Sequence, residues 1–109
     1  MFSLLDSSCH GAMTVERFES SLTEAEPPAG LTPPLLGLWL ALAGRWDDAH
    51  TAVQDETTSA AAWVHAYLHR EEGDNSNAAY WYRRAGRPIA RGNREAEWRE
   101  IVRSLLEMQ

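Results

Sequence analysis

Residues 63–88 read WVHAYLHREEGDNSNAAYWYRRAGRP, and this stretch decides the fold that we expect. The residues from 60 to 72 contain no proline or glycine and are rich in Ala, Leu, Glu and Arg, which favours a helix. Gly73 ends that helix, because glycine takes a left-handed cap without a steric penalty. An Asp-Asn pair then starts a second helix over about 76–85, which Gly86 closes. So short a turn predicts two antiparallel helices lying side by side.

The second helix carries one buried stripe. Ala78, Tyr82 and Ala85 are spaced at i, i+4 and i+7, so they share a face. The two alanines let the helix backbones approach, and the tyrosine ring fills the space between them. We therefore expect Tyr82 to be a core residue of the hairpin.

A Gly-Asp turn, an alanine five residues after the glycine and an aromatic residue four further on resemble the pattern of a tetratricopeptide repeat. A weaker copy lies upstream, and a Leu-Gly pair matches the one that such repeats carry on their first helix. The residues concerned are Gly73, Asp74, Ala78, Tyr82 and Ala85 in one unit, and Leu36, Gly37, Gly44, Ala49 and Val53 in the other. The resemblance covers about residues 33–90 and implies stacked helical hairpins.

The sequence also departs from that family. Its two turn glycines, Gly44 and Gly73, are 29 residues apart, against about 34 in the family. His65 and His69 stand where the family packs Leu and Tyr. The string HAYLHREEGDNSNAAYWYRRAGRP itself resembles a signature of small, mostly uncharacterised microbial proteins, and that resemblance implies no activity.

The whole chain is expected to be an all-α protein. We interpret residues 1–12 as a flexible segment and residues 13–109 as a single domain of two stacked tetratricopeptide-like hairpins with flanking helices. Flanking helices are predicted over about 14–26 and from Asn93 onward. The segment 33–43 is apolar nearly all round, which is typical of a buried helix.

Size and charge exclude several classes of function. A chain of 109 residues can bury one core without disulfides, and its single cysteine, Cys9, offers no disulfide framework. The net charge of −6 argues against nucleic-acid binding. The longest apolar run, 35–43, is too short to cross a membrane, and the N-terminus is a poor signal peptide, so we expect a cytoplasmic protein.

Histidine spacing marks one candidate site. His65 and His69 are four residues apart and share a helical face, with Glu72 three further on. At this spacing both imidazoles can bind one zinc ion or another divalent metal ion, and His50 of the preceding hairpin could be a further ligand. The spacer lacks the glutamate of a metalloprotease helix. The alternatives are imidazoles that pack in the core, hydrogen-bonded to Tyr or Glu neighbours, and histidine acid–base chemistry.

Aromatic and basic residues mark two further candidates. A groove between first helices would be lined by Trp39, His65 and His69 or their neighbours. Tyr80 and Trp81 either line a groove as well or pack on the last helix. Arginines cluster after these aromatic residues, and a guanidinium binds carboxylates or phosphates with two parallel hydrogen bonds. These residues, Arg83, Arg84, Arg87 and Arg91, either stabilise a helix end and pair with the acidic first half of the chain or recognise an acidic partner.

These patterns support two hypotheses about function. The first is a module that binds a protein or peptide partner without catalysis, with a homodimer formed through the apolar segment 35–43 as a further expectation. The second is a small metal-binding protein or enzyme built on His65, His69, Glu72 and His50. We find no phosphate-binding loop, nucleophile elbow or cysteine cluster in the sequence.

Overall fold

The computed structural model describes residues 13–108, and within that range the chain is all-helical, with no strand. The proposed flexible segment, 1–12, lies outside the described residues. The helices are α2 (Val15–Ser20), the short 3-10 helix η1 (Ser21–Thr23), α3 (Pro33–Leu42), α4 (Trp46–Gln54), α5 (Ser59–Glu71), α6 (Asn75–Ala85) and α7 (Arg94–Glu107).

Two tight turns create the hairpins that the sequence predicted. Gly44 links α3 to α4 with a φ of 81°, and Gly73 links α5 to α6 with a φ of 89°. A side chain at either position would have room, because no other heavy atom lies within 4 Å of the added carbon. The left-handed backbone, rather than crowding, is therefore what requires glycine at both turns.

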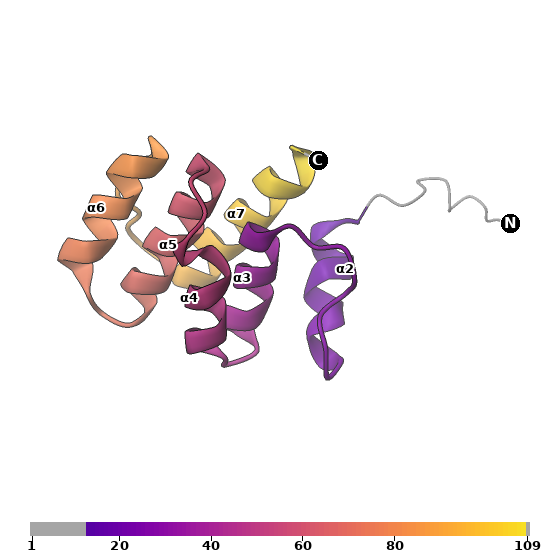
Figure 1. Ribbon diagram of the computed structural model, residues 1–109. Helices are drawn as coiled ribbons and strands as arrows, with labels where there is room; N and C mark the ends of the chain where they lie inside the picture. The colour runs from indigo at the N-terminus through magenta and orange to yellow at the C-terminus, as the bar shows by residue number, and fades with distance from the viewer. Residues whose placement is uncertain (1–12, 109) are drawn as a thin grey trace, which may run out of the picture.

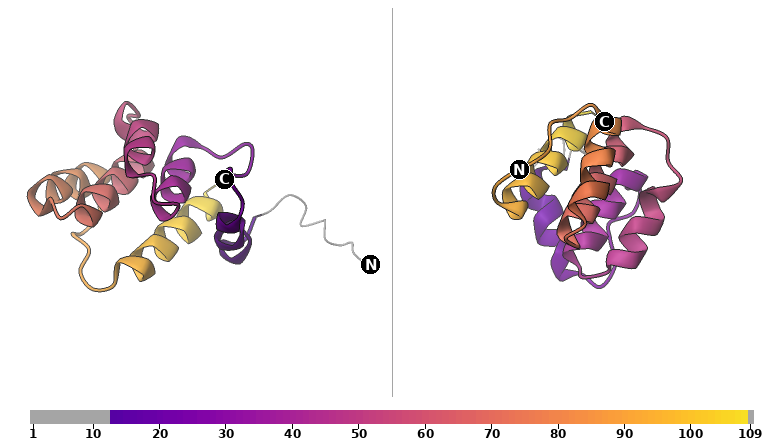
Figure 2. Two further views of the ribbon diagram at one scale, coloured as in Figure 1. Left: turned by 90° about the horizontal axis from the view of Figure 1, so that it is seen from below. Right: turned by 90° about the vertical axis from the view of Figure 1, so that its left-hand side faces the viewer.

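The hairpins lie next to each other. Figure 1 shows α6, α5, α4 and α3 following one another across the molecule, with α2 at the end of the row. Helix α4 packs on α5, so the second helix of one hairpin contacts the first helix of the next. Figure 2 shows α7 along one side of this row, where it packs on α3, α5 and α2.

Gly37 lies where α3, α4 and α5 meet. A methyl group in its place would stand 3.1 Å from Val53 Cγ1 of α4 and 3.2 Å from Val64 Cγ1 of α5. Such distances are shorter than ordinary packing contacts, so the two valine side chains would have to shift by a few tenths of an ångström to admit a larger residue. The absence of a side chain at Gly37 thus makes room for the close packing of Val53 and Val64 at this point.

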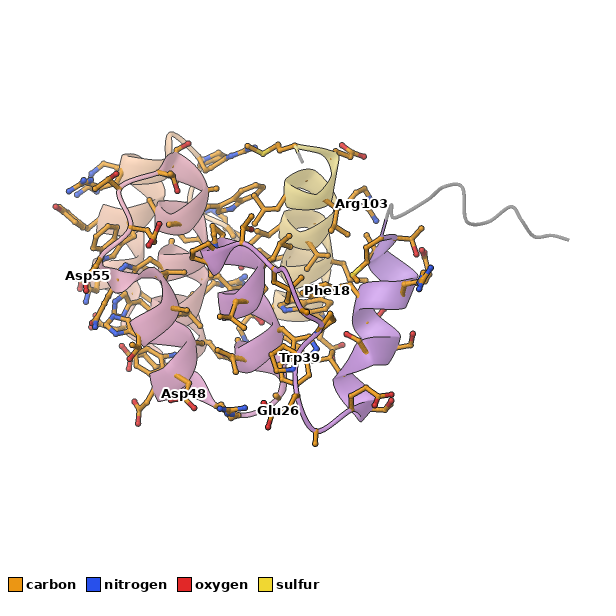
Figure 3. The ribbon with its side chains drawn as sticks, turned by 45° about the vertical axis from the view of Figure 1, so that its right-hand side comes forward. Phe18, Glu26, Trp39, Asp48, Asp55 and Arg103 are labelled. Atoms are coloured by element: carbon orange, nitrogen blue, oxygen red, sulfur yellow. The ribbon has the colours of Figure 1, made fainter. Side chains whose placement is uncertain are left out.

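The apolar helix α3 is buried within the chain itself, as its composition predicted. Leu35 and Leu38 are fully buried and Trp39 is 1% exposed. Helix α2 covers this end of the core, where Phe18 and Trp39 lie between α2 and its neighbours (Figure 3). Trp39 Nε1 donates to Ser21 Oγ at 3.0 Å. The face expected to form a homodimer is consequently covered by the chain's own helices.

Helix α2 is shorter than the predicted 14–26. The α-helix ends at Ser20 and the chain continues as a 3-10 turn. Ser21 Oγ donates to the carbonyl of Phe18 at 2.6 Å, and Thr23 Oγ1 donates to that of Ser20 at 3.0 Å. Serine and threonine hydroxyls compete in this way with the regular backbone bonds of a helix, which explains the early end.

Tyr82 is buried between α5 and α6, as expected, and it also anchors α7. Its hydroxyl donates a hydrogen bond to the carboxylate of Glu97. Arg70 Nη1 donates to the other oxygen of that carboxylate at 2.7 Å, and Glu97 is only 7% exposed. Sequence reasoning gave Glu97 no role. Its burial is tolerable because both oxygens are paired.

We expect Tyr82→Ala to abolish cooperative unfolding or to lower the free energy of unfolding by about 3–5 kcal/mol, because it leaves a cavity and an underpaired carboxylate. Tyr82→Phe removes only the hydroxyl and should cost less. Chemical denaturation followed by circular dichroism measures both. An unchanged transition in Tyr82→Ala would show that the ring contributes nothing to the core.

Candidate metal centre

Three histidines from two helices come together. His65 and His69 lie one turn apart on α5, and His50 faces them from α4 because these two helices pack against each other. One ring nitrogen from each histidine lies within 4.8 Å of the others. His65 and His69 are buried, whereas His50 is half-buried and gives the cluster its solvent side. The structure therefore unites all three predicted imidazoles.

Hydrogen bonds orient these rings. His50 Nε2 and His65 Nε2 are 2.9 Å apart, so one nitrogen carries the proton and the other accepts it. His69 Nδ1 lies 2.7 Å from Glu72 Oε2. Because a carboxylate only accepts, His69 donates from Nδ1, and its Nε2 keeps the lone pair when the ring is neutral. A histidine held by a carboxylate on one side is a common arrangement behind metal ligands.

Two tryptophans cover the cluster. Trp81 of α6 stacks on His65 with ring centroids 3.8 Å apart and planes 12° apart. Trp46 of α4 stacks on His50 at 5.0 Å and meets His69 edge-on at 5.9 Å. The Trp46 indole is itself fixed, because its Nε1 donates to the carbonyl of Leu68 at 2.9 Å. These contacts leave the imidazoles little freedom to turn.

The environment keeps two of the rings neutral. Burial, followed by the nearby His50 and His69, lowers the pKa of His65 to about 4. Burial and the neighbouring His69 also lower the pKa of His50. Both are therefore deprotonated at neutral pH, which is the form that binds metal ions.

Packing alone leaves one nitrogen of the histidine cluster without a hydrogen bond. His65 Nδ1 is buried and has no hydrogen-bond partner among the described residues. The packing alternative expected imidazoles bonded to Tyr or Glu neighbours, and only His69 has such a bond. A buried polar atom without a partner costs free energy. In addition, the 2.9 Å between His50 and His65 is close to the separation of about 3.3 Å between two nitrogens on a tetrahedral zinc ion.

Glu72 contacts His69 on the side of Nδ1. It also forms a second potential ligand group with His69 and Asp74, in which both acids are exposed. Asp74 already caps α6, since its carboxylate accepts from the amide of Asn77 at 3.3 Å. Glu72 is thus placed to position His69, with three imidazoles as the candidate ligands.

Trp39 does not share a surface with the other predicted groove residues. Trp39 belongs to the buried core. Tyr80 is 43% exposed and meets Trp81 edge-on at 5.2 Å. The groove candidates that the structure does gather are therefore His65, His69, Tyr80 and Trp81.

The four candidate arginines are exposed and do not share one contact. Arg84 lies over Trp81 and Tyr80, while Arg87 lies 3.8 Å from the ring centroid of Trp63. Arg83 and Arg91 are the other two. Among the described residues, no carboxylate lies within 4.0 Å of any of the four guanidinium groups. Pairing with the acidic half of the chain is therefore not how the described structure uses them.

Two hollows lie away from the histidines. One, of about 370 Å³, lies between the starts of α3 and α5 and the end of α7, and one of about 300 Å³ lies beside Arg70 and Arg91. Every helix in residues 13–108 is too short or too polar to span a bilayer. No protein-family model, curated protein or solved structure matches this chain.

Metal-free protein should lose stability on acidification through His65. The unfolded chain takes up this proton near pH 6.5, but the folded chain only near pH 4. The free energy of unfolding therefore falls between those values, by up to about 3 kcal/mol, and this contribution is constant outside them. Urea unfolding from pH 4 to 8 in the presence of chelator measures it.

The difference between the wild type and His65→Gln isolates this effect. Burial raises the pKa of Glu71, so protonation of that carboxyl acts in the opposite sense in both proteins and cancels in the comparison. His50→Gln should flatten the profile less, because His50 is only half-buried. Parallel profiles for the wild type and His65→Gln would contradict a buried, neutral His65.

Proposed function

We propose that this protein binds a divalent transition-metal ion through His50, His65 and His69. The observation that carries the proposal is the convergence of three imidazoles from two separate hairpins, with one nitrogen of each within 4.8 Å of the others. The burial that keeps His65 and His50 neutral supports it, and so does the carboxylate that holds the ring of His69.

The donor set defines the class of metal. Three imidazole nitrogens suit zinc, cobalt, nickel and copper, whereas magnesium and calcium prefer oxygen ligands. Three protein ligands leave at least one position of a tetrahedral ion for water or another ligand. Zinc is our first candidate, because its coordination accepts the observed spacing with small adjustments.

Metal binding accounts for the cluster better than acid–base catalysis. A general base works best when its pKa lies near the working pH. The pKa of His65 is about 4, so this imidazole is a weak base at neutral pH. Coordination requires only its lone pair.

A bound ion would join the two hairpins, because His50 belongs to the first and His65 and His69 belong to the second. It would replace the single hydrogen bond between His50 and His65 by metal–nitrogen bonds. Binding to the folded state alone stabilises a protein by about 3 kcal/mol at a hundredfold excess of free ligand over Kd. The metal therefore acts on the fold as well as on the site.

We expect zinc to bind with a stoichiometry of one and to raise Tm, as measured by isothermal titration calorimetry and thermal unfolding on chelator-treated protein. His65→Ala, His69→Ala and His50→Ala should each abolish or strongly weaken binding. Glu72→Gln should weaken it roughly tenfold or more, because it removes the partner of His69. Folded His69→Ala that binds zinc as tightly as the wild type would refute the proposal.

Glu71→Gln is the matched control for Glu72→Gln. The two glutamates are adjacent at the end of α5, where Glu71 is the last helical residue and Glu72 its C-cap, but only Glu72 contacts a candidate ligand. Glu71→Gln should leave zinc affinity unchanged. Equal losses in both variants would point to general acidity of the surface and not to support of His69.

A second candidate function is the docking of a protein partner on a tetratricopeptide-like stack. It is favoured by two consecutive hairpins that lie side by side and by the exposed Tyr80, which adjoins Trp81 and Arg84. Tyrosine, tryptophan and arginine are the residue types that dominate binding hot spots. Here the metal would stiffen the surface that the partner contacts.

Tyr80→Ala should then release a protein that the wild type retains from native lysate, with an affinity loss of about thirtyfold if the ring is a hot spot. The control is Leu42→Ala, because Leu42 has a similar exposed fraction, 39% against 43% for Tyr80. Retention of the same protein by Tyr80→Ala at the wild-type level would exclude this surface as the docking site.

A further inference from the structure

The hollow of about 300 Å³ beside Arg70 and Arg91 lies where the end of α5, the helix α6 and the segment that connects α6 to α7 meet. Arg70 comes from α5, Arg91 from the connecting segment and Asn75 from the start of α6. Among the described residues that line this hollow there is no Asp or Glu. Its volume is at the lower end of the range for small-molecule sites.

Arg70 is held by two contacts, and one of them brings Arg91 to the hollow. Its Nη1 donates to Glu97 Oε1 at 2.7 Å, and its Nη2 donates to the carbonyl of Gly92. Gly92 follows Arg91 in the chain, so the second bond holds the connecting segment against α5. These bonds use two of the five N–H donors of the guanidinium. The Arg70 side chain is 15% exposed, so solvent screens its charge only weakly.

One positive charge at this hollow is not compensated. Glu97 balances the charge of Arg70, and its two oxygens accept from Arg70 and from the Tyr82 hydroxyl. No described carboxylate lies within 4.0 Å of the Arg91 guanidinium. The carboxylate of Asp74 caps α6 and is not part of the lining. The charge balance therefore suits a ligand with a single negative charge.

The remaining lining residues are largely apolar. Ala78 and Tyr82 lie on the same face of α6 as Asn75, and Ile89 and Ala90 come from the connecting segment. Ile89 is 47% exposed, so a ligand that covered it would remove apolar surface from water. A few charged or polar groups combined with apolar neighbours are typical of small-molecule sites.

We infer that this hollow binds a small organic acid, with its carboxylate on Arg91 and Arg70 and its hydrocarbon part against Ile89 and Ala78. A carboxylate matches the planar fork of a guanidinium, and the side-chain amide of Asn75 is a further donor. The single uncompensated charge favours a carboxylate over a doubly charged phosphate ester. The inference goes beyond the proposed metal function and does not depend on it.

The test uses the full chain, labelled with ¹⁵N and treated with chelator so that no metal ion can bind the probe, and benzoate as the ligand. Benzoate should shift the NMR signals of the Asn75 side-chain amide and of the Gly92 backbone amide in a saturable way. Benzyl alcohol lacks the charge and acetate lacks the ring, so each should bind about tenfold more weakly. Phenyl phosphate should also bind more weakly than benzoate.

Arg91→Gln should weaken benzoate binding about tenfold, because it removes a charge-assisted hydrogen bond. Arg91 is exposed, so its replacement should leave the fold intact. Arg83→Gln is the matched control, because Arg83 is exposed, has no described carboxylate within 4.0 Å and does not line the hollow. It should bind benzoate like the wild type.

Three results would overturn the inference. The first is the absence of saturable shifts with benzoate. The second is equal or tighter binding of benzyl alcohol, acetate or phenyl phosphate. The third is equal binding of benzoate by Arg91→Gln and Arg83→Gln. None of these results bears on the affinity for zinc, so the metal function stands or fails separately.

Discussion

The contact between α4 and α5 is the constraint on which the rest of the structure depends. Gly37 allows it, because the absence of a side chain lets Val53 and Val64 close over the same point. The two helices then run close enough for His50 Nε2 to reach within 2.9 Å of His65 Nε2. A core position with no chemistry of its own therefore sets the geometry of the polar cluster.

The same contact explains why the cluster is costly to maintain. A polar ring that becomes buried loses its hydrogen bonds to water, and it must form hydrogen bonds within the protein to offset this loss. His69 forms such a hydrogen bond with Glu72, but His65 Nδ1 has no hydrogen-bond partner among the described residues. In a helical hairpin, a leucine at such a position would pack without this cost. Residues that lower stability at the position they occupy are typical of functional sites.

Much of the fold follows from local sequence signals. The left-handed glycines 44 and 73 place both turns, the last helix begins after Asn93 as expected, and the stripe of α6 faces inward. These features depend on neighbours within a few residues, so spacing alone predicts them. The pairing of His65 with His69 is predictable for the same reason, and His50 follows once the hairpins are placed side by side.

What sequence could not predict depends on contacts between distant segments. Trp39 was expected in a groove but lies in the core, because α2 folds over it and Ser21 accepts its indole proton. Glu97 lies on the buried face of α7, four residues before Ile101, but its charge predicts a solvent-exposed side chain; Tyr82 and Arg70 pair with it inside. The stacking of Trp81 on His65 likewise requires knowledge of how α6 turns about its axis. Local sequence patterns do not predict how a helix is rotated about its axis or which distant segment buries a side chain.

The stacking of an indole on each of two cluster histidines has a practical consequence. Indole emission responds to charge and to paramagnetic ions at short range, and Trp81 and Trp46 lie directly against His65 and His50. The other tryptophans, Trp39, Trp63 and Trp98, make no ring contact with these histidines in the described chain. The intrinsic fluorescence of Trp81 and Trp46 should therefore report what binds between the hairpins, without an added label.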